Sequence, residues 1–406
     1  MQAPEITTAI DVSPLFTPFR LKGVTLENRF VMPGMQRGWA EEGGAPSPRL
    51  ADYYARRVEG GVSLIISESA AVDHPSSTQQ PPVVWITEET LPGWARCVEA
   101  VNAAGGHMLI QLWHEGALRH EGGDGRYAHV PTLSPSGIVF GGKRNGRAAS
   151  ADDLASLRDA WVRSAKLSQS IGAAGVEVHA CHGYMLDQFL WAETNRRDDG
   201  YGGDDIRARV RFPTEVVAAI RAACGPDFII SLRFSQWKEA NYDAQVVRNP
   251  EELRLMLDAF RAAGADLFHA SMRRFWLPEW EGSDLSLAGW TKSLTDAPVI
   301  TVGSVGLDVD VMDNLLLAKE PKPTVEWSMA ELMRRFSNGE FDLVSVGRSV
   351  IGDPEWVNKV RDARYGDIRP FRRADLGMED MQFDASFVAE AHGLDPKVLS
   401  HGAPTM

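Results

Sequence analysis

The sequence contains little cysteine and no long apolar run. Its three cysteines, Cys97, Cys181 and Cys224, are far apart and form no CxxC pair. This pattern excludes a disulfide framework and fits a reducing compartment. No segment approaches the roughly 18 uninterrupted apolar residues that a membrane span needs, and the first residues lack the basic and apolar segments of a secretory signal. We therefore expect a cytoplasmic protein with no membrane partner.

Basic residues are the scarcer charged class. The 406 residues include 42 Lys and Arg against 55 Asp and Glu, which gives a net charge of −13. This balance disfavours a nucleic-acid partner or an anionic membrane surface. Any anionic ligand must therefore be held by a few local basic groups. The hydrophobic share of 44% is that of an ordinary globular protein with a large core.

Short apolar, β-branched runs alternate with amphipathic helical patterns along the chain, and no GxGxxG follows the first of these runs. That absence argues against a doubly wound dinucleotide-binding sheet. Repeated strand-then-helix units without a change in composition predict a (β/α)8 TIM barrel, an α/β fold whose active site lies at the C-terminal strand ends. We expect its strands at residues 29–32, 62–68, 107–113, 175–179, 228–234, 265–270, 298–303 and 341–347.

We expect one domain, residues 1–406, with a barrel core at about 15–356. Residues 15–32 predict an N-terminal hairpin that closes the barrel floor, and residues 311–340 predict a helical insertion between strands seven and eight. The C-terminal tail, residues 373–406, could cap the barrel or reach a neighbouring subunit of a homo-oligomer. Its composition favours neither arrangement.

The stretch GVEVHACHGYMLDQFL, residues 175–190, places His179, His182 and Tyr184 just past one strand end. A zinc site needs about three protein ligands, and no HExxH, HxH or carboxylate set completes one nearby. Two imidazole N–H groups could instead hold a carbonyl oxygen and stabilise charge that develops there. A phenol could protonate carbon. The arrangement suits an α,β-unsaturated carbonyl substrate, but no side chain can supply the hydride.

The segment HACHGYMLDQFLWAETNRRDDGYGGD, residues 179–204, resembles the hallmark of the Old Yellow Enzyme family of FMN-dependent ene-reductases. Further blocks occur in the same order: LFTPFRLKGVTLENRFVMPGM, YYARRVEGGVSLIISE, IQLWHEG and LVSVGRSVIGDPEW. The resemblance covers Leu15 to about Trp356. It implies that NADPH or NADH reduces a bound FMN, which then delivers hydride to the substrate.

The resemblance also implies a role for individual residues. His179 and His182 would bind the substrate carbonyl, and Tyr184 would protonate Cα. Independently of the resemblance, Trp39, Trp113 and Trp276 lie at or after predicted strand ends and could line the open face of the flavin on the substrate side. FMN would be held by Pro33, Gly34, Met35, Gln36, Ser69, Gln111, Arg233, Gly303, Ser304, Gly347 and Arg348.

The run MPGMQ departs from the family pattern at two positions. Gly34 stands where proline is expected, and Gln36 stands where threonine or cysteine is expected to contact the flavin. The Gln36 carboxamide could replace that contact or intrude on the substrate.

Three other functions remain open on the same barrel. The first is amine dehydrogenation or N-demethylation by a short flavoprotein, because three cysteines are too few for a four-cysteine iron–sulfur cluster. The second is a flavin-binding protein that does not turn over. The third is a metal-dependent hydrolase, which metal content would separate from the flavin-dependent functions.

Overall fold

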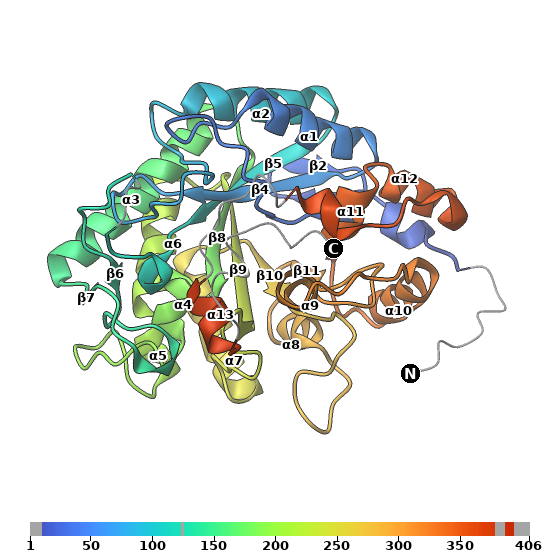
Figure 1. The fold of residues 1–406 in the computed structure, drawn as a ribbon. Helices are drawn as coiled ribbons and strands as arrows, with labels where there is room; N and C mark the ends of the chain where they lie inside the picture. Colours follow the sequence, from blue (N-terminus) through green and yellow to red (C-terminus); the bar gives the residue numbers. More distant parts are fainter. Residues whose placement is uncertain (1–9, 123–125, 378–385, 394–406) are drawn as a thin grey trace.

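The computed structural model describes residues 10–122, 126–377 and 386–393. Eight parallel strands close into a barrel at its centre (Figure 1), as predicted from the sequence. The closed order is β10-β11-β12-β3-β4-β5-β8-β9. The strands are β3 (Phe30–Met32), β4 (Leu64–Ala71), β5 (His107–Trp113), β8 (Gly175–His182), β9 (Ile229–Lys238), β10 (Leu267–Ser271), β11 (Val299–Val302) and β12 (Leu343–Ser345).

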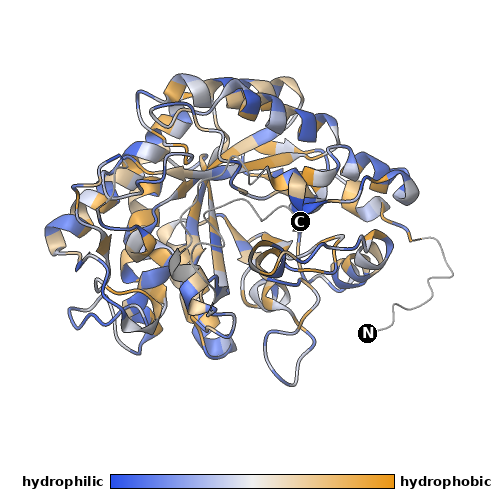
Figure 2. Ribbon diagram, in the orientation of Figure 1, coloured by the Kyte–Doolittle hydropathy of each residue, from blue (hydrophilic) through white to orange (hydrophobic). Residues whose placement is uncertain are grey.

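Helices surround the barrel, with hydrophobic strands inside and hydrophilic residues spread over the outer helices (Figure 2). Sequence signals set their ends: Ser150 and Asp153 form a capping box, and Gly264 ends a helix with φ of 107°. None of the described helices has the length and apolarity to cross a membrane. The main helices are α1 (Pro48–Glu59), α2 (Leu91–Ala103), α3 (Ala151–Ser170), α6 (Arg211–Cys224), α7 (Pro250–Ala263), α8 (Leu287–Leu294), α10 (Val325–Ser337) and α12 (Trp356–Arg361).

Shorter elements occupy the connections between strands and helices. Residues 206–224 form two helices, α5 (Ile206–Arg209) and α6. Pro213 has no N–H to donate, so it is tolerated in the first turn of α6 but not inside a longer helix. The others are η1 (Ser13–Phe16), η2 (Gly116–Leu118), β6 (Leu133–Ser134), η3 (Phe140–Gly142), β7 (Arg147–Ala148), α4 (Met185–Leu190), α9 (Val311–Leu316), α11 (Arg348–Gly352), η4 (Tyr365–Asp367), η5 (Arg373–Leu376) and α13 (Ser386–Ala391).

An N-terminal hairpin closes the barrel floor, as expected. Strands β1 (Phe19–Leu21) and β2 (Val24–Leu26) pair antiparallel. Leu21 and Leu26 are buried in the same apolar cluster as residues near the N-terminal ends of seven barrel strands. With the floor sealed by apolar side chains, the open end of the barrel is the C-terminal one. The cluster comprises Leu21, Leu26, Val31, Leu64, Ile66, Leu109, Ile229, Leu267, Ile300 and Leu343.

The predicted helical insertion lies between β11 and β12 and contains α9 followed by α10. In the C-terminal tail, residues 378–385 and 394–406 lie outside the described residues. The described part contacts loops of the barrel itself, because Lys143 pairs with Glu390 at 2.8 Å and the His392 ring bonds the backbone oxygen of Glu239 at 2.6 Å. The division into one domain with a tail remains a prediction.

Candidate active site

A cavity of about 370 Å³ opens among the C-terminal strand ends. That volume lies in the range of small-molecule and cofactor sites. Its lining is contributed by residues that follow most of the barrel strands, from Pro33 after β3 to Arg348 after β12. This is the position at which TIM-barrel proteins build active sites.

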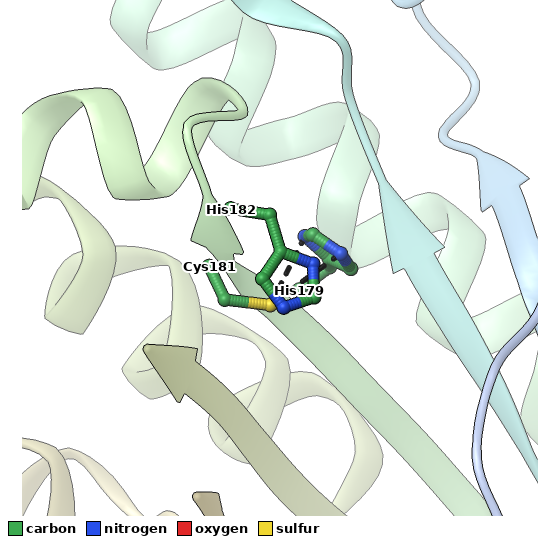
Figure 3. Close-up of side chains that lie close together, drawn as sticks. All are labelled: His179, Cys181 and His182. Carbon is green, nitrogen blue, oxygen red and sulfur yellow. Dashed lines mark hydrogen bonds between the residues drawn. The ribbon is translucent and has the colours of Figure 1, made fainter. Parts of the chain in front are cut away.

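Strand β8 brings His179, Cys181 and His182 together (Figure 3). His179 and Cys181 are two residues apart and therefore share a face of the strand. His182 would point to the opposite face, but the pairing register shifts between Ala180 and His182, and His182 has φ of 63°. This irregularity turns the second imidazole toward the first, and the two ring centroids lie 5.5 Å apart.

The structure supplies a third potential metal ligand that the sequence argument did not consider. A nitrogen of each imidazole and the Cys181 sulfur lie within 4.8 Å of one another. However, burial raises the pKa of the Cys181 thiol well above its ordinary value, and metals bind the thiolate. The Arg233 guanidinium also adds positive charge nearby. The local electrostatics therefore disfavour a bound cation.

Both imidazoles are neutral at physiological pH. Burial and the positive charge of Arg233 lower the pKa of His179 to about 3, and they hold the pKa of His182 well below its ordinary value. His182 Nε2 lies 2.8 Å from the Ser271 hydroxyl, and Arg233 donates to the same hydroxyl at 3.3 Å. Each ring therefore offers one N–H group beside a fixed guanidinium, an arrangement that stabilises a developing oxyanion.

Tyr184 stands over this pair at the start of α4. Its ring lies 5.4 Å from His179 and 5.1 Å from Trp113. Its hydroxyl donates a hydrogen bond of 3.2 Å to Glu239. Burial and the neighbouring Glu239 and Glu115 carboxylates raise the pKa of Tyr184 well above its ordinary value. The side chain is therefore a phenol that retains its proton.

A buried network fixes Gln111 at the base of the cavity. Glu177 accepts hydrogen bonds from Gln111 (2.8 Å), Ser231 (3.0 Å) and His269 (2.9 Å). Burial opposes its charge, but His269, Arg233 and Gln111 outweigh this and lower the pKa of Glu177 to about 2. The Gln111 oxygen accepts from Ser69 at 2.5 Å. The amide orientation is thus set, and one donor and one acceptor position remain for a ligand.

Close packing explains glycine at position 34. A Cβ there would lie 2.6 Å from Gln111 Nε2 and from the backbone oxygen of Ser67. The Gly34 backbone oxygen also accepts from Arg233 at 3.3 Å. Gln36, beside it in the cavity, donates to the Ser69 backbone oxygen at 3.4 Å. The departure from proline at residue 34 therefore accompanies the placement of Gln111.

The opposite end of the cavity is basic. Arg348 donates to the Ser304 hydroxyl at 3.3 Å and to the Asp310 backbone oxygen at 3.3 Å. A Cβ at Gly303, where φ is 147°, would lie 2.6 Å from the Met272 backbone oxygen. Glycine thus allows the backbone after β11 to approach closely, and Arg348 with Ser304 can bind phosphate oxygens.

Several cavity residues carry buried polar atoms that have no hydrogen-bond partner among the described residues. These atoms are Gln36 Oε1, Arg233 Nε, Arg273 Nε and Ser345 Oγ. Buried polar groups are rarely left unpaired, so these four atoms are expected to form hydrogen bonds with a polar ligand in the cavity. With one carboxamide and arginine region and one basic glycine-containing end, the residues fit both the polar ring edge and the phosphate of FMN.

Most residues expected at the site line this cavity, but two tryptophans do not. Trp39 packs edge-to-face against Tyr53 at 5.5 Å, and the Arg49 guanidinium lies over its ring at 3.7 Å. Trp276 packs edge-on against Trp327 at 4.8 Å. Neither Trp39 nor Trp276 is among the described residues that line the cavity. The lining does include Pro33, Gly34, Met35, Gln36, Ser69, Gln111, Trp113, His179, His182, Tyr184, Arg233, Gly303, Ser304, Gly347 and Arg348.

Sequence reasoning overlooked four polar lining residues: Gln80, Glu239, Ser271 and Ser345. Ser271 ends β10, so its position at a strand end could have identified it. Glu239 follows β9 within a tight turn, in which Lys238 and Asn241 exchange backbone hydrogen bonds of 2.9 and 3.1 Å. No motif marks that turn in the sequence.

Comparison with known proteins identifies relatives along most of the chain. A model of the NADH:flavin oxidoreductase / NADH oxidase family matches residues 14–330. An NADH oxidase of Thermoanaerobacter brockii is 31% identical over 373 residues, which cover 89% of this chain and 53% of the relative. The 12-oxophytodienoate reductase 2 of Arabidopsis thaliana is 30% identical over 253 residues, which cover 60% of this chain and 66% of the relative.

A metal reductase of Desulforamulus reducens is 27% identical, over 92% of this chain and 52% of the relative. The chain thus spans about half the length of this metal reductase and of the NADH oxidase. Among solved structures, morphinone reductase in complex with tetrahydroNAD superposes with a TM-score of 0.73 at 23% identity, over 89% of this chain and 93% of that one. The Old Yellow Enzyme homologue from Zymomonas mobilis gives 0.69 at 21%, over 97% and 99%. These structures share its fold.

Proposed function

The chain belongs to the NADH:flavin oxidoreductase / NADH oxidase family, and from this premise we propose that it is an FMN-dependent ene-reductase that uses NADH or NADPH to reduce the C=C bond of α,β-unsaturated carbonyl compounds. The observation that carries the proposal is the convergence of two neutral imidazoles and one phenol on a single cavity beside Arg233. The family consists of FMN-dependent oxidoreductases, whereas the substrate class is our inference.

Neutral imidazoles suit the carbonyl end of such a substrate. Each can donate one hydrogen bond to the carbonyl oxygen, and the charge on that oxygen increases as the C=C bond is reduced. Hydrogen bonds aimed at developing charge stabilise the transition state more than the ground state. The Ser271 hydroxyl, 2.8 Å from His182 Nε2, holds that ring in place.

Tyr184 suits the second half of the reaction. Reduction at Cβ leaves an enolate, which needs a proton at Cα. Tyr184 keeps its proton at neutral pH because its pKa is raised by burial and by Glu239. Its ring lies 5.4 Å from that of His179, so a carbonyl held by the imidazoles places Cα within reach of the phenol.

FMN, when bound, would supply the hydride that no side chain provides. Gln111, Ser69 and Arg233 would hold the polar edge of its ring, and Ser304 and Arg348 would hold its phosphate. The orientation of the Gln111 amide is maintained by Glu177 at 2.8 Å. The Arg233 guanidinium would stabilise negative charge on the ring.

The charge of the cavity favours this reaction over amine oxidation. Among the described residues that line it, Arg233, Arg273 and Arg348 carry guanidinium groups, and Glu239 alone carries a carboxyl. Burial raises the pKa of Glu239 to about 7, which reduces its charge further. Such a cavity attracts phosphate and enolate and repels a cationic amine. The name of the 12-oxophytodienoate reductases, which denotes a ketone-bearing diene, also supports an enone.

Turnover with defined substrates tests the proposal. In the first assay, consumption of NADH or NADPH is followed under anaerobic conditions with 2-cyclohexenone as the acceptor. In the second, reduction of a dye is followed with dimethylglycine or trimethylamine as the reductant. We expect stoichiometric formation of cyclohexanone and no amine-dependent dye reduction. Dye reduction by an amine without reduction of the enone would assign the site to the alternative chemistry.

A further inference from the structure

Glu239 is a carboxyl group inside the cavity that the mechanism above does not use. Its side chain lines the cavity and accepts the Tyr184 hydroxyl hydrogen bond at 3.2 Å. Among the described lining residues it is the only Asp or Glu. A carboxyl in this position can exchange a proton with the phenol. Such an exchange contributes to the reaction only if Tyr184 gives up its proton to the substrate.

The backbone around Glu239 is held from three directions. Its N–H donates to the backbone oxygen of His182 at 3.4 Å, and its own backbone oxygen is bonded by His392 at 2.6 Å. The preceding residue, Lys238, is fixed by a buried ion pair with Asp187 at 2.8 Å. Asp187 in turn accepts from the N–H of Gly183, next to Tyr184, at 2.6 Å. The carboxyl and the phenol are thus positioned by one connected network.

We propose that Glu239 is the proton-relay partner of Tyr184, which returns a proton to the phenol oxygen as Tyr184 protonates the substrate. The inference rests on the proposed ene-reductase function, in which reduced FMN supplies the hydride to Cβ. The Tyr184 O–H bond breaks as a C–H bond forms at Cα of the enolate. The Glu239 O–H bond breaks as that proton passes to the tyrosine oxygen, and a carboxylate and a neutral phenol remain. Glu239 then takes a proton from water.

The relay avoids the formation of a buried Tyr184 phenolate. Burial and nearby carboxylates disfavour its phenolate, so a phenol that gave up its proton alone would leave an unfavourable anion in the cavity. Protonated Glu239 prevents that anion from forming. The pKa of Glu239 is raised by burial to about 7, against opposing effects of the Tyr184 hydrogen bond and the Arg233 charge. The acid form is therefore abundant up to about neutral pH.

Few other charged or titratable groups face this pair. Arg233 on β9 adds positive charge, and Glu115 after β5 and Cys181 on β8 act on Tyr184. His179, whose ring lies 5.4 Å from that of Tyr184, is neutral because its pKa is lowered to about 3. His182 on β8 and His392 after α13 are bonded to the Glu239 backbone. Tyr242 stays neutral, because burial raises its pKa to about 12. Since His182 and both phenols keep one protonation state near neutrality, Glu239 is the group expected to titrate there among the described residues that line the cavity.

The test is the pH dependence of flavin reoxidation in a single turnover. FMN-loaded protein is reduced with light, mixed anaerobically with 2-cyclohexenone and followed by absorbance in Glu239→Gln, Glu279→Gln and the unsubstituted protein. Glu279 is a matched control, because burial also raises the pKa of its carboxyl to about 7. It is not among the described residues that line this cavity.

We expect the rate constant to fall about tenfold per pH unit above about pH 7 in the unsubstituted protein and in Glu279→Gln. In Glu239→Gln it should be roughly tenfold lower near pH 6 and nearly flat with pH. Mixtures of H2O and D2O add a second readout. The rate constant should depend on deuterium fraction along a curve when two protons move, and along a straight line in Glu239→Gln.

Each outcome bears on one claim. If the unsubstituted protein binds FMN but its reduced flavin is not reoxidised by 2-cyclohexenone, the proposed function fails and the relay fails with it. If reoxidation occurs but Glu239→Gln keeps the same pH profile and the curved deuterium dependence, the relay alone is overturned. Should Glu239→Gln not fold, Tyr184→Phe serves instead, and retention of the curved dependence there would equally contradict the relay.

Discussion

Lys238 and Asp187 form an ion pair of 2.8 Å in which both side chains are fully buried. Burial raises the pKa of Asp187 to about 6 and lowers that of Lys238, so each charge depends on the other. Asp187 lies in α4 and Lys238 ends β9. The pair therefore joins the turn that carries His182 and Tyr184 to the strand that carries Arg233.

We predict that Lys238→Met lowers the free energy of unfolding by about 3–5 kcal/mol, because it leaves the Asp187 carboxylate buried and unpaired. Urea denaturation followed by circular dichroism measures the change. The double variant Asp187→Leu/Lys238→Met is the control, and it should recover most of the loss. Equal losses in the single and double variants would show that the unpaired charge is not the cause.

Gly34→Ala should weaken FMN binding by roughly tenfold or more, since its Cβ would lie 2.6 Å from Gln111 Nε2 and overpacking costs about 1–3 kcal/mol. The flavin-to-protein ratio after dialysis and titration of the apoprotein with FMN provide the measurement. Gly23→Ala is a matched control, because no described atom lies within 4 Å of a Cβ at that hairpin position. Equal FMN affinity in the two variants would refute the packing argument.

His179→Ala and His182→Ala should each weaken binding of a phenolic ligand such as 4-hydroxybenzaldehyde by roughly tenfold to a hundredfold, the worth of a hydrogen bond to a charged oxygen. Binding is titrated through the flavin absorbance.

Tyr184→Phe should slow flavin reoxidation by an enone about a hundredfold while reduction by NADH or NADPH stays nearly unchanged. Equal loss of both half-reactions in Tyr184→Phe would contradict its role as proton donor.

Glu68 provides a prediction for stability against pH. Its side chain is fully buried, one carboxyl oxygen accepts from the Arg37 N–H at 2.9 Å, and the other has no partner among the described residues. Burial raises its pKa from 4.5 to about 7. The folded state therefore holds a proton that the unfolded state releases between about pH 4.5 and 7, and this contribution to stability is lost as pH rises through that window.

Glu68→Gln should remove this dependence. Urea midpoints measured near pH 5 and pH 8 should differ less in the variant than in the unsubstituted protein, because the amide does not titrate. If the two proteins show the same difference between these pH values, Glu68 is ionised in the folded state throughout.

The barrel and much of the cavity could be predicted because their signals are local. A short apolar run that ends in His179, Cys181 and His182 identifies both a strand and its polar C-terminal end. The hairpin that closes the floor is equally visible in the alternation of Phe19–Leu26. The closure of eight such strands then brings Gln111, Arg233 and Arg348 into one cavity without further information.

What could not be predicted depends on side-chain direction and tight turns. Trp39 follows β3, as a cavity residue would, yet its side chain packs against Tyr53 and Arg49 and does not line the cavity. Glu239 carries no motif, and its place in the cavity results from the turn closed by Lys238 and Asn241. The reason for glycine at position 34 also required the structure, because only there is it clear that a Cβ on this residue would lie 2.6 Å from Gln111 Nε2.

The most direct test of the central claim is the anaerobic absorbance spectrum of the purified protein, reduced by light or dithionite and then mixed with 2-cyclohexenone. The account predicts an oxidised flavin band that disappears on reduction and returns with the enone, with cyclohexanone as the product. A flavin that stays reduced in excess enone would contradict ene-reduction, and a protein that binds no flavin would contradict the cavity assignment itself.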